Sequence, residues 1–350
     1  MNPTHLTRRT ALGLLGAAVA TPAYLRRAQA AEVTLRLSHF LPAVSSMQTK
    51  FFEPWAAELS EASGGRIEVQ IFPSMTLGGK PPQLADQARN GIADIAWTLP
   101  VYTPDRFPVA ETMSLPFMVT DATRSSVAME KLMSEYGQKE YRGMKPLAFH
   151  THAGGKFHMR DKVVTSGADL KGLRIRSPNQ SFGELLKLLE VEPVFFPVTE
   201  MAVGLTNGVI DGCCLPYEVV PAFKLQELTH EHSAPAPAAR GLYSNTFALV
   251  MNQRTFDRLA PDLQEIIDAQ AGAPLSRRIG ELFDWSEQVG LEAVEASGGG
   301  IHEIPAEEIA AWKDLSAPIY DAWAAKLDKA GLDGTAILAR ANDLLDQTTA

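Results

Sequence analysis

The residues best suited to binding chemistry form a short basic segment near the middle of the chain. The run Asp169–Pro178 (DLKGLRIRSP) predicts a strand over Leu173–Arg176, and on that strand Arg174 and Arg176 share one face. An arginine side chain offers parallel N–H groups that grip a carboxylate in a bidentate way, and a strand holds it more rigidly than a loop would. The spacing alone is more typical of a surface salt bridge, and both interpretations stay open at this point.

Histidines form a second group with possible chemistry. His150 and His152 lie two residues apart on a predicted strand, His158 follows after a glycine turn, and His230 and His232 form a similar pair. Two imidazoles can bind Zn²⁺, but a catalytic site needs a third ligand, usually a carboxylate, and the chain contains no HExxH pattern. We therefore expect hydrogen-bonding histidines, with no metal and no cofactor. A metal site is the alternative.

Other catalytic patterns are weak. Cys213 and Cys214 are adjacent and lack basic neighbours, so we expect them to fill space at the end of a strand, with a vicinal disulfide as the alternative. There is no Gly-x-Ser-x-Gly turn. The run Leu77–Lys80 (LGGK) lacks the spacing of a phosphate-binding loop. The net charge of −9 argues against nucleic acid as a partner.

The first thirty residues have the pattern of an export signal. Arg8 and Arg9 precede an apolar run over Ala11–Ala20, and Ala28–Ala30 (AQA) supplies the small residues that a signal peptidase needs. The apolar run is shorter than the roughly 18 residues of a membrane span. We therefore predict a signal peptide of the twin-arginine type over residues 1–30 and a periplasmic, exported protein.

Strands and helices alternate along the remaining chain, which favours an α/β fold with parallel strands. The predicted strands are 34–38, 67–72, 94–97, 147–151, 173–176, 210–214 and 246–251. The predicted helices are 47–62, 81–90, 182–189, 198–205, 306–330 and 334–347, together with a long helix over 261–297 that is interrupted near Gly272-Ala273-Pro274.

Two stiff or glycine-rich segments, Thr151–Gly155 and Ala234–Ala239, are typical of crossings between lobes. Two crossings make each lobe discontinuous. We predict one lobe from residues 31–153 plus about 242–281, and a second from about 154–241 plus 282–350. Two α/β lobes joined in this way can close on a ligand.

Several short motifs carry a family resemblance. In chain order they are TLGG (76–79), NGIAD (90–94), SLPF (114–117), LKGLRIR (170–176) and NGVIDG (207–212). Together, in this order and spacing, they resemble the solute-binding proteins of tripartite ATP-independent periplasmic (TRAP) transporters over the whole mature chain. The resemblance implies a two-lobed Venus-flytrap fold with a long kinked helix spanning the lobes. It also implies a protein that is no enzyme, captures an organic acid as a monomer and delivers it to the membrane permease subunits.

The resemblance also implies part of the binding site. The last arginine of the LKGLRIR motif, Arg176, would bind the ligand carboxylate, whereas Arg174 would be structural. Asn179 matches a position that can contact ligand. Lys156 is the nearest candidate for a second basic group, with His158 behind it.

The chain departs from the family after the Asp-Gly turn, where Cys213–Glu218 (CCLPYE) replaces polar residues. Fewer hydrogen-bonding groups argue against a sugar acid and favour a monocarboxylate with an apolar or aromatic body, with a 2-hydroxy or 2-oxo acid still possible. Aromatic residues at strand ends and in adjoining loops could face the cleft, although each could instead belong to the core. The further candidate contacts are Phe40, Trp97, Tyr102, Phe196, Cys214, Pro216 and Tyr217.

Two other functions stay open from the sequence. One is a binding protein of another transporter or sensor class with the same shape. The other is a periplasmic metalloenzyme that uses His150, His152 and His158.

The first prediction concerns processing. We expect the mature protein to begin at Ala31, because the Ala28–Ala30 run follows the apolar segment at the spacing of a cleavage site. The intact mass of the exported protein checks this expectation. A mass that still includes residues 1–30 would contradict it.

Overall fold

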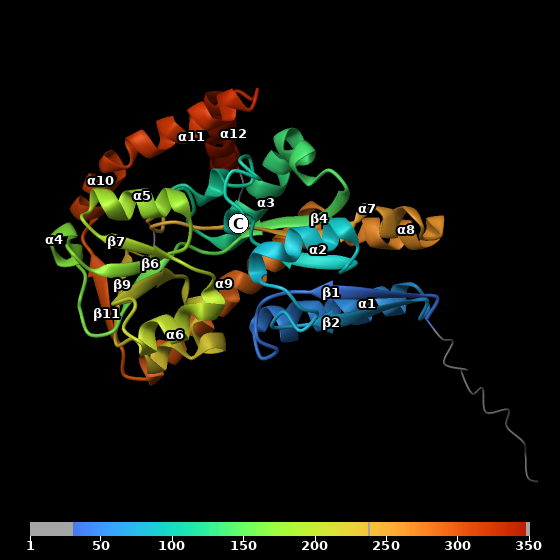
Figure 1. Cartoon of the computed structure of the whole chain (residues 1–350), viewed down its shortest axis with the longest axis horizontal. Helices are drawn as coiled ribbons and strands as arrows, with labels where there is room; N and C mark the ends of the chain where they lie inside the picture. Colours follow the sequence, from blue (N-terminus) through green and yellow to red (C-terminus); the bar gives the residue numbers. More distant parts are fainter. Residues whose placement is uncertain (1–30, 237–238, 348–350) are drawn as a thin grey trace, which may run out of the picture. The chain divides into compact units, whose positions relative to one another are not determined.

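The computed structural model describes residues 31–236 and 239–347, which fold around two β-sheets (Figure 1). The predicted signal peptide, 1–30, lies outside the described residues. No helix in the described part of the chain has the length and apolar character that a membrane span needs.

The first sheet has five strands in the order β2-β1-β3-β10-β4. Their bounds are β1 Val33–Ser38, β2 Ile67–Phe72, β3 Ile95–Thr98, β4 Met144–Thr151 and β10 Thr246–Asn252. Alternation explains β1, because Leu35 and Leu37 point into the core and are fully buried. Among the helices that contact this sheet are α1 (Glu53–Ala62), α2 (Leu84–Asn90) and α3 (Ala122–Leu132).

The second sheet has six strands in the order β11-β9-β5-β8-β6-β7. Their bounds are β5 Lys156–Met159, β6 Arg174–Ser177, β7 Glu192–Phe195, β8 Gly212–Leu215, β9 Glu231–Pro235 and β11 Gly300–Ile304. The remaining helices are α4 Gly167–Leu170, α5 Gln180–Leu188, α6 Met201–Thr206, α7 Gln253–Asp257, α8 Pro261–Ala269, α9 Ala273–Ala296, α10 Ala306–Leu315, α11 Ala317–Lys329 and α12 Gly334–Gln347.

The predicted α/β class is confirmed, but the expectation of parallel strands is wrong at two places. β10 is antiparallel to β3 and β4, and β5 is antiparallel to β8 and β9. Parallel neighbours need a crossover connection within one sheet. β5 and β10 instead enter their sheets directly from the other sheet, so no crossover helix fixes their direction.

The strands that pass between the sheets lie close together. A side chain on Gly154 would meet the backbone of Gly241, since a Cβ atom there would lie 2.4 Å from the Gly241 Cα atom. A hydrogen bond from Gly155 N to Tyr243 O at 2.8 Å joins the same two segments of the chain. Glycine is needed at position 154, because only a residue without a side chain lets the two backbone segments approach this closely.

The long helix is present, divided in two. α8 ends at Ala269, Gly272 adopts a positive φ of 72°, and α9 begins at Ala273 with a proline in its first turn. α9 packs on α3 and β4 of the first sheet and on the short helix Tyr217–Val219, which follows β8 of the second (Figure 1). The predicted helix over 306–330 is also divided, at Ser316, where α11 begins with Pro318 in its first turn.

Seven of these helices and strands were not anticipated from the sequence, namely α3, α4, α7, β5, β7, β9 and β11. The strands among them are only four or five residues long, and β7 and β9 contain proline, which is confined to edge or irregular positions in sheets. We propose the lobe limits as predicted, 31–153 with about 242–281 and about 154–241 with 282–350, because each sheet lies within one of these sets.

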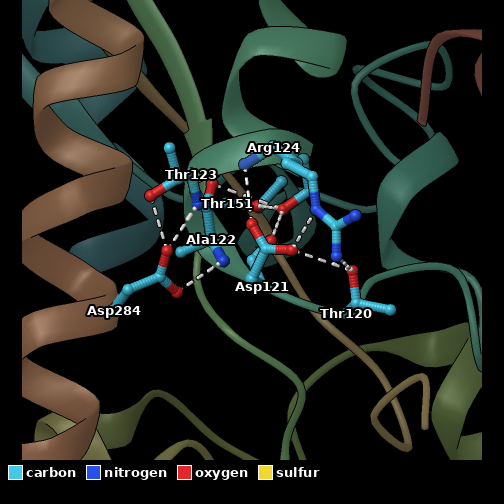
Figure 2. A network of polar contacts seen from close by, with 8 residues as sticks. Thr120, Asp121, Ala122, Thr123, Arg124, Thr151 and Asp284 are labelled. Carbon is cyan, nitrogen blue, oxygen red and sulfur yellow. Dashed lines mark hydrogen bonds and ion pairs between the residues drawn. The ribbon is translucent and has the colours of Figure 1, made fainter. Parts of the chain in front are cut away.

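A polar network ties α9 to α3 (Figure 2). The Asp284 carboxylate accepts hydrogen bonds from Ala122 N at 2.7 Å, Thr123 N at 2.9 Å and Thr123 Oγ1 at 2.5 Å. Asp121 caps the same helix by accepting from Arg124 N at 2.8 Å. The first N–H groups of a helix have no partner within the helix, so both carboxylates stabilise the start of α3.

Replacing Asp284 tests this network. Asp284→Ala should lower the free energy of unfolding by about 1–3 kcal/mol, because two backbone donors and one hydroxyl lose their acceptor. Urea unfolding measures the effect, with Glu281→Ala as the control because Glu281 is an exposed carboxylate on the same helix. Equal stability of the two variants would show that the Asp284 contacts contribute nothing.

Candidate functional site

A small cavity lies where residues from both sheets and their adjoining loops meet. Its volume is about 30 Å³, which is room for two or three waters when one water needs roughly 10–15 Å³. Its walls are mostly apolar, as is usual for a small-molecule site. Because the volume is so small, the walls must move when a ligand enters. The lining residues are Phe40, Leu41, Trp97, Leu99, Tyr102, His152, Arg176, Val198, Leu215, Pro216, Glu218, Val219, Tyr243, Asn245 and Phe247.

Arg176 is the charged centre of this cavity. It lies on β6, is only 2% exposed, and its Nε atom donates to the carbonyl oxygen of Phe196 at 3.1 Å. No carboxylate among the described residues forms an ion pair with it. A buried guanidinium without a counter-ion is costly, so the cavity favours an anion.

Arg174 lies on the same strand but has a different environment. Its Nη2 atom pairs with Asp211 Oδ1 at 2.7 Å, and its side chain is 42% exposed. The two interpretations of the arginine spacing therefore each describe one residue, with a surface salt bridge at Arg174 and an unpaired buried charge at Arg176.

Stacked rings form the apolar wall. Trp97 on β3 lies parallel to Phe247 on β10, with a centroid distance of 4.6 Å and an interplanar angle of 6°, and it also stacks on Phe40 at 4.9 Å. The Trp97 Nε1 atom donates to His150 Nε2 at 2.8 Å, which holds the indole in place. Such a wall suits a flat ligand body.

Two further titratable groups in the cavity, Glu218 and His152, are neutral near pH 7. Burial raises the pKa of the Glu218 carboxyl to about 8, and the neighbouring Glu287 charge adds to this rise. Burial lowers the pKa of His152 to about 3. Arg176 is therefore the one full charge in the lining, and the cavity complements a single negative charge.

Five of the predicted site residues line this cavity, namely Phe40, Trp97, Tyr102, Arg176 and Pro216. Six others lie elsewhere. Lys156 forms an ion pair with Glu287 and faces a separate cavity of about 500 Å³, which Tyr217 also lines. His158 is fully buried, with its Nδ1 atom 2.7 Å from His232 Nδ1.

The remaining three predicted residues have structural partners next to the cavity. Asn179 caps α5 by accepting from Phe182 N at 2.8 Å, and its Nδ2 atom donates to Asn245 Oδ1 at 2.9 Å. Phe196 supplies the carbonyl that positions Arg176. Cys214 is fully buried in β8, where its carbonyl oxygen accepts from the Tyr243 hydroxyl at 2.9 Å.

The histidines do not converge on one point. His150 bonds to Trp97, His152 Nδ1 bonds to its neighbouring backbone, and His158 bonds to His232. Within residues 31–236 and 239–347, no cluster of three or more His, Cys, Asp or Glu side chains has a geometry that could hold a metal ion.

Sequence reasoning missed several residues of the lining. Asn245 and Phe247 flank the start of a strand that was predicted, and their spacing of two places both side chains on one face. That alternation could have identified them. His152 and Glu218 give no such signal, because only the fold shows which histidine and which acid border the cavity.

A protein-family model and several known proteins match this chain. The family model described as bacterial extracellular solute-binding protein, family 7 (DctP), matches residues 37–327. Among curated relatives, the C4-dicarboxylate-binding periplasmic protein DctP of Rhodobacter capsulatus is 23% identical over 329 residues, which cover 92% of this chain and 96% of that protein.

Solved structures resemble the chain more strongly. A TRAP solute-binding protein from Rhodoferax ferrireducens, in complex with copurified benzoate, is 38% identical with a TM-score of 0.88, covering 90% of this chain and 98% of that one. A marine metagenome TRAP solute-binding protein in complex with 3-hydroxybenzoate is 36% identical with a TM-score of 0.89, covering 92% and 100%. These matches confirm the resemblance and the two-lobed fold expected from the sequence.

The pKa of Glu218 gives a prediction on stability. An unfolded glutamate ionises near pH 4.5, whereas folded Glu218 keeps its proton to about pH 8. Folding therefore takes up a proton between these values, so the free energy of unfolding falls as pH rises through this window. Glu218→Gln should reduce that fall.

Thermal unfolding of wild type and variant between pH 4.5 and 8 measures the difference. Glu61→Gln, at an exposed position on α1, is the control for loss of one carboxylate. Parallel curves for wild type and Glu218→Gln would refute a raised pKa at Glu218.

Proposed function

Because the chain belongs to the DctP family of bacterial extracellular solute-binding proteins, we propose that it captures a small aromatic monocarboxylate. It then presents this ligand to the membrane subunits of a TRAP permease. The proposal includes export to the periplasm through the signal peptide at 1–30, action as a monomer, and no bond-breaking step.

Arg176 is the observation that carries the proposal. Its guanidinium is buried, lacks an acidic partner among the described residues, and lies in a cavity walled by Phe40, Trp97 and Phe247. A ligand carboxylate would supply the missing charge through paired hydrogen bonds, while a flat apolar body would lie against the rings.

The charge balance favours one carboxylate over two. Since Glu218 and His152 are neutral near pH 7, a second carboxylate in the cavity would lack a cationic partner. Lys156 does not provide one, because Glu287 already pairs with it. A polyhydroxylated acid is equally disfavoured, since few polar groups line the walls.

The related structures support this ligand class. The 38% identical protein is described with benzoate and the 36% identical protein with 3-hydroxybenzoate, and both ligands join one carboxylate to an aromatic ring.

Contacts across the cavity suggest how capture works. The Tyr102 hydroxyl accepts from Val198 N at 3.0 Å, and Asn179 bonds to Asn245, so the two sides are joined around the cavity. A ligand that contacts both sides stabilises the closed arrangement over an open one and shifts the population toward it. The closed form would then be the one that the permease recognises.

Substitution of Arg176 tests the proposed function. Arg176→Ala should weaken benzoate binding about 30- to 5,000-fold, which corresponds to a loss of about 2–5 kcal/mol. Arg176→Lys should restore only part of the affinity, because an ammonium group is a point charge without the parallel donors. Isothermal titration calorimetry measures all three proteins.

Arg174→Ala is the matched control on the same strand. Its guanidinium pairs with Asp211 at the surface, so its loss should change affinity less than about tenfold. Normal binding by Arg176→Ala, or loss of binding in Arg174→Ala alone, would show that the site is assigned to the wrong arginine.

A further inference from the structure

His152 brings an unused hydrogen-bond acceptor to the cavity. The side chain is 1% exposed and lines the cavity, and its Nε2 atom has no hydrogen-bond partner within residues 31–236 and 239–347. Among the residues that line this cavity, His152 alone has a buried polar side-chain atom without a hydrogen-bond partner. Buried polar atoms are normally paired, so a lone unpaired atom in a binding cavity needs an explanation.

Geometry fixes which kind of group can pair with this atom. The Nδ1 atom of His152 lies 2.5 Å from the carbonyl oxygen of Ala153, and a carbonyl oxygen can only accept. Nδ1 therefore carries the proton of the neutral ring, and Nε2 presents a lone pair. Its partner must be a donor.

The surroundings of His152 place that donor on the ligand. The imidazole packs edge-on against Tyr243 at 5.3 Å and Phe247 at 6.0 Å, so rings cover its sides. The Tyr243 hydroxyl donates to Cys214 O instead. Arg176 and His152 line the same small cavity, so a ligand whose carboxylate is held by Arg176 has the rest of its body beside the imidazole.

We propose that His152 Nε2 accepts a hydrogen bond from a ligand hydroxyl, so that the protein selects aromatic monocarboxylates that carry a hydroxyl group. The inference rests on the proposed function and narrows it to hydroxy acids. A 2-oxo acid is disfavoured, because its carbonyl oxygen would face the Nε2 lone pair without a proton between them. The hydroxyl can lie next to the carboxylate or on the ring, and the experiment separates these positions.

Matched ligand pairs test the proposal on the wild-type protein. Calorimetry at pH 7 compares mandelate with phenylacetate, which lacks the 2-hydroxyl, and 3-hydroxybenzoate with benzoate, which lacks the ring hydroxyl. One pair should show about 10- to 100-fold tighter binding of the hydroxylated acid. Phenylglyoxylate, the 2-oxo counterpart of mandelate, should bind at least tenfold more weakly than the preferred hydroxy acid.

Two substitutions at His152 assign the preference to this residue. His152→Phe keeps a ring but removes the acceptor, so the affinity ratio of the preferred pair should fall to near one while the unhydroxylated acid still binds. His152→Gln retains an acceptor oxygen and should keep part of the ratio. His232→Phe is the control, because it also removes a buried imidazole with an unpaired Nε2 atom, but His232 does not line the cavity, so the ratio should stay unchanged.

The outcomes separate this inference from the function on which it rests. If the unhydroxylated acids bind but neither pair differs in affinity, the proposed function stands and the role of His152 is overturned. A preference that persists in His152→Phe has the same meaning. If none of the acids binds the wild-type protein, the proposed function itself fails and this inference fails with it. The wild-type comparisons decide these points even if His152→Phe does not fold.

Discussion

The central constraint is a buried guanidinium that has no counter-ion in the described part of the chain. Arg176 is 2% exposed, and its side chain forms one hydrogen bond to another described residue, the backbone carbonyl of Phe196. Burying an unpaired charge is unfavourable, so an anion that binds beside Arg176 relieves this cost. Neither nearby acid supplies a counter-ion to Arg176. Glu218 is neutral, and the Glu287 carboxylate pairs with Lys156 instead.

The rest of the fold positions this charge between two sheets. β6 carries Arg176, whereas β3 and β10 of the other sheet carry Trp97 and Phe247. The cavity therefore exists only where the two sheets meet, and a ligand must contact both. α9 packs against elements next to each sheet, and Asp284 fixes it to the start of α3, so the same helix connects both walls.

The sequence predicts those site residues that follow from alternation along a strand, and it misplaces those whose position depends on the tertiary structure. Alternation within the LKGLRIR motif places Arg176 and Arg174 on one face, and the family resemblance distinguishes them. The family resemblance implies a second basic group near the glycine crossing and so pointed to Lys156, with His158 behind it, but both lie on β5, a four-residue antiparallel strand with no clear sequence pattern. The acceptor on His152 depends on a contact with its own neighbouring backbone, which no spacing rule reveals.

A crystal structure of the protein in complex with benzoate tests the central claim most directly. The account predicts both carboxylate oxygens at about 2.7–2.9 Å from the Arg176 guanidinium, with the ligand ring against the wall formed by Phe40, Trp97 and Phe247. A carboxylate bound instead beside Lys156, in the cavity of about 500 Å³, would contradict it.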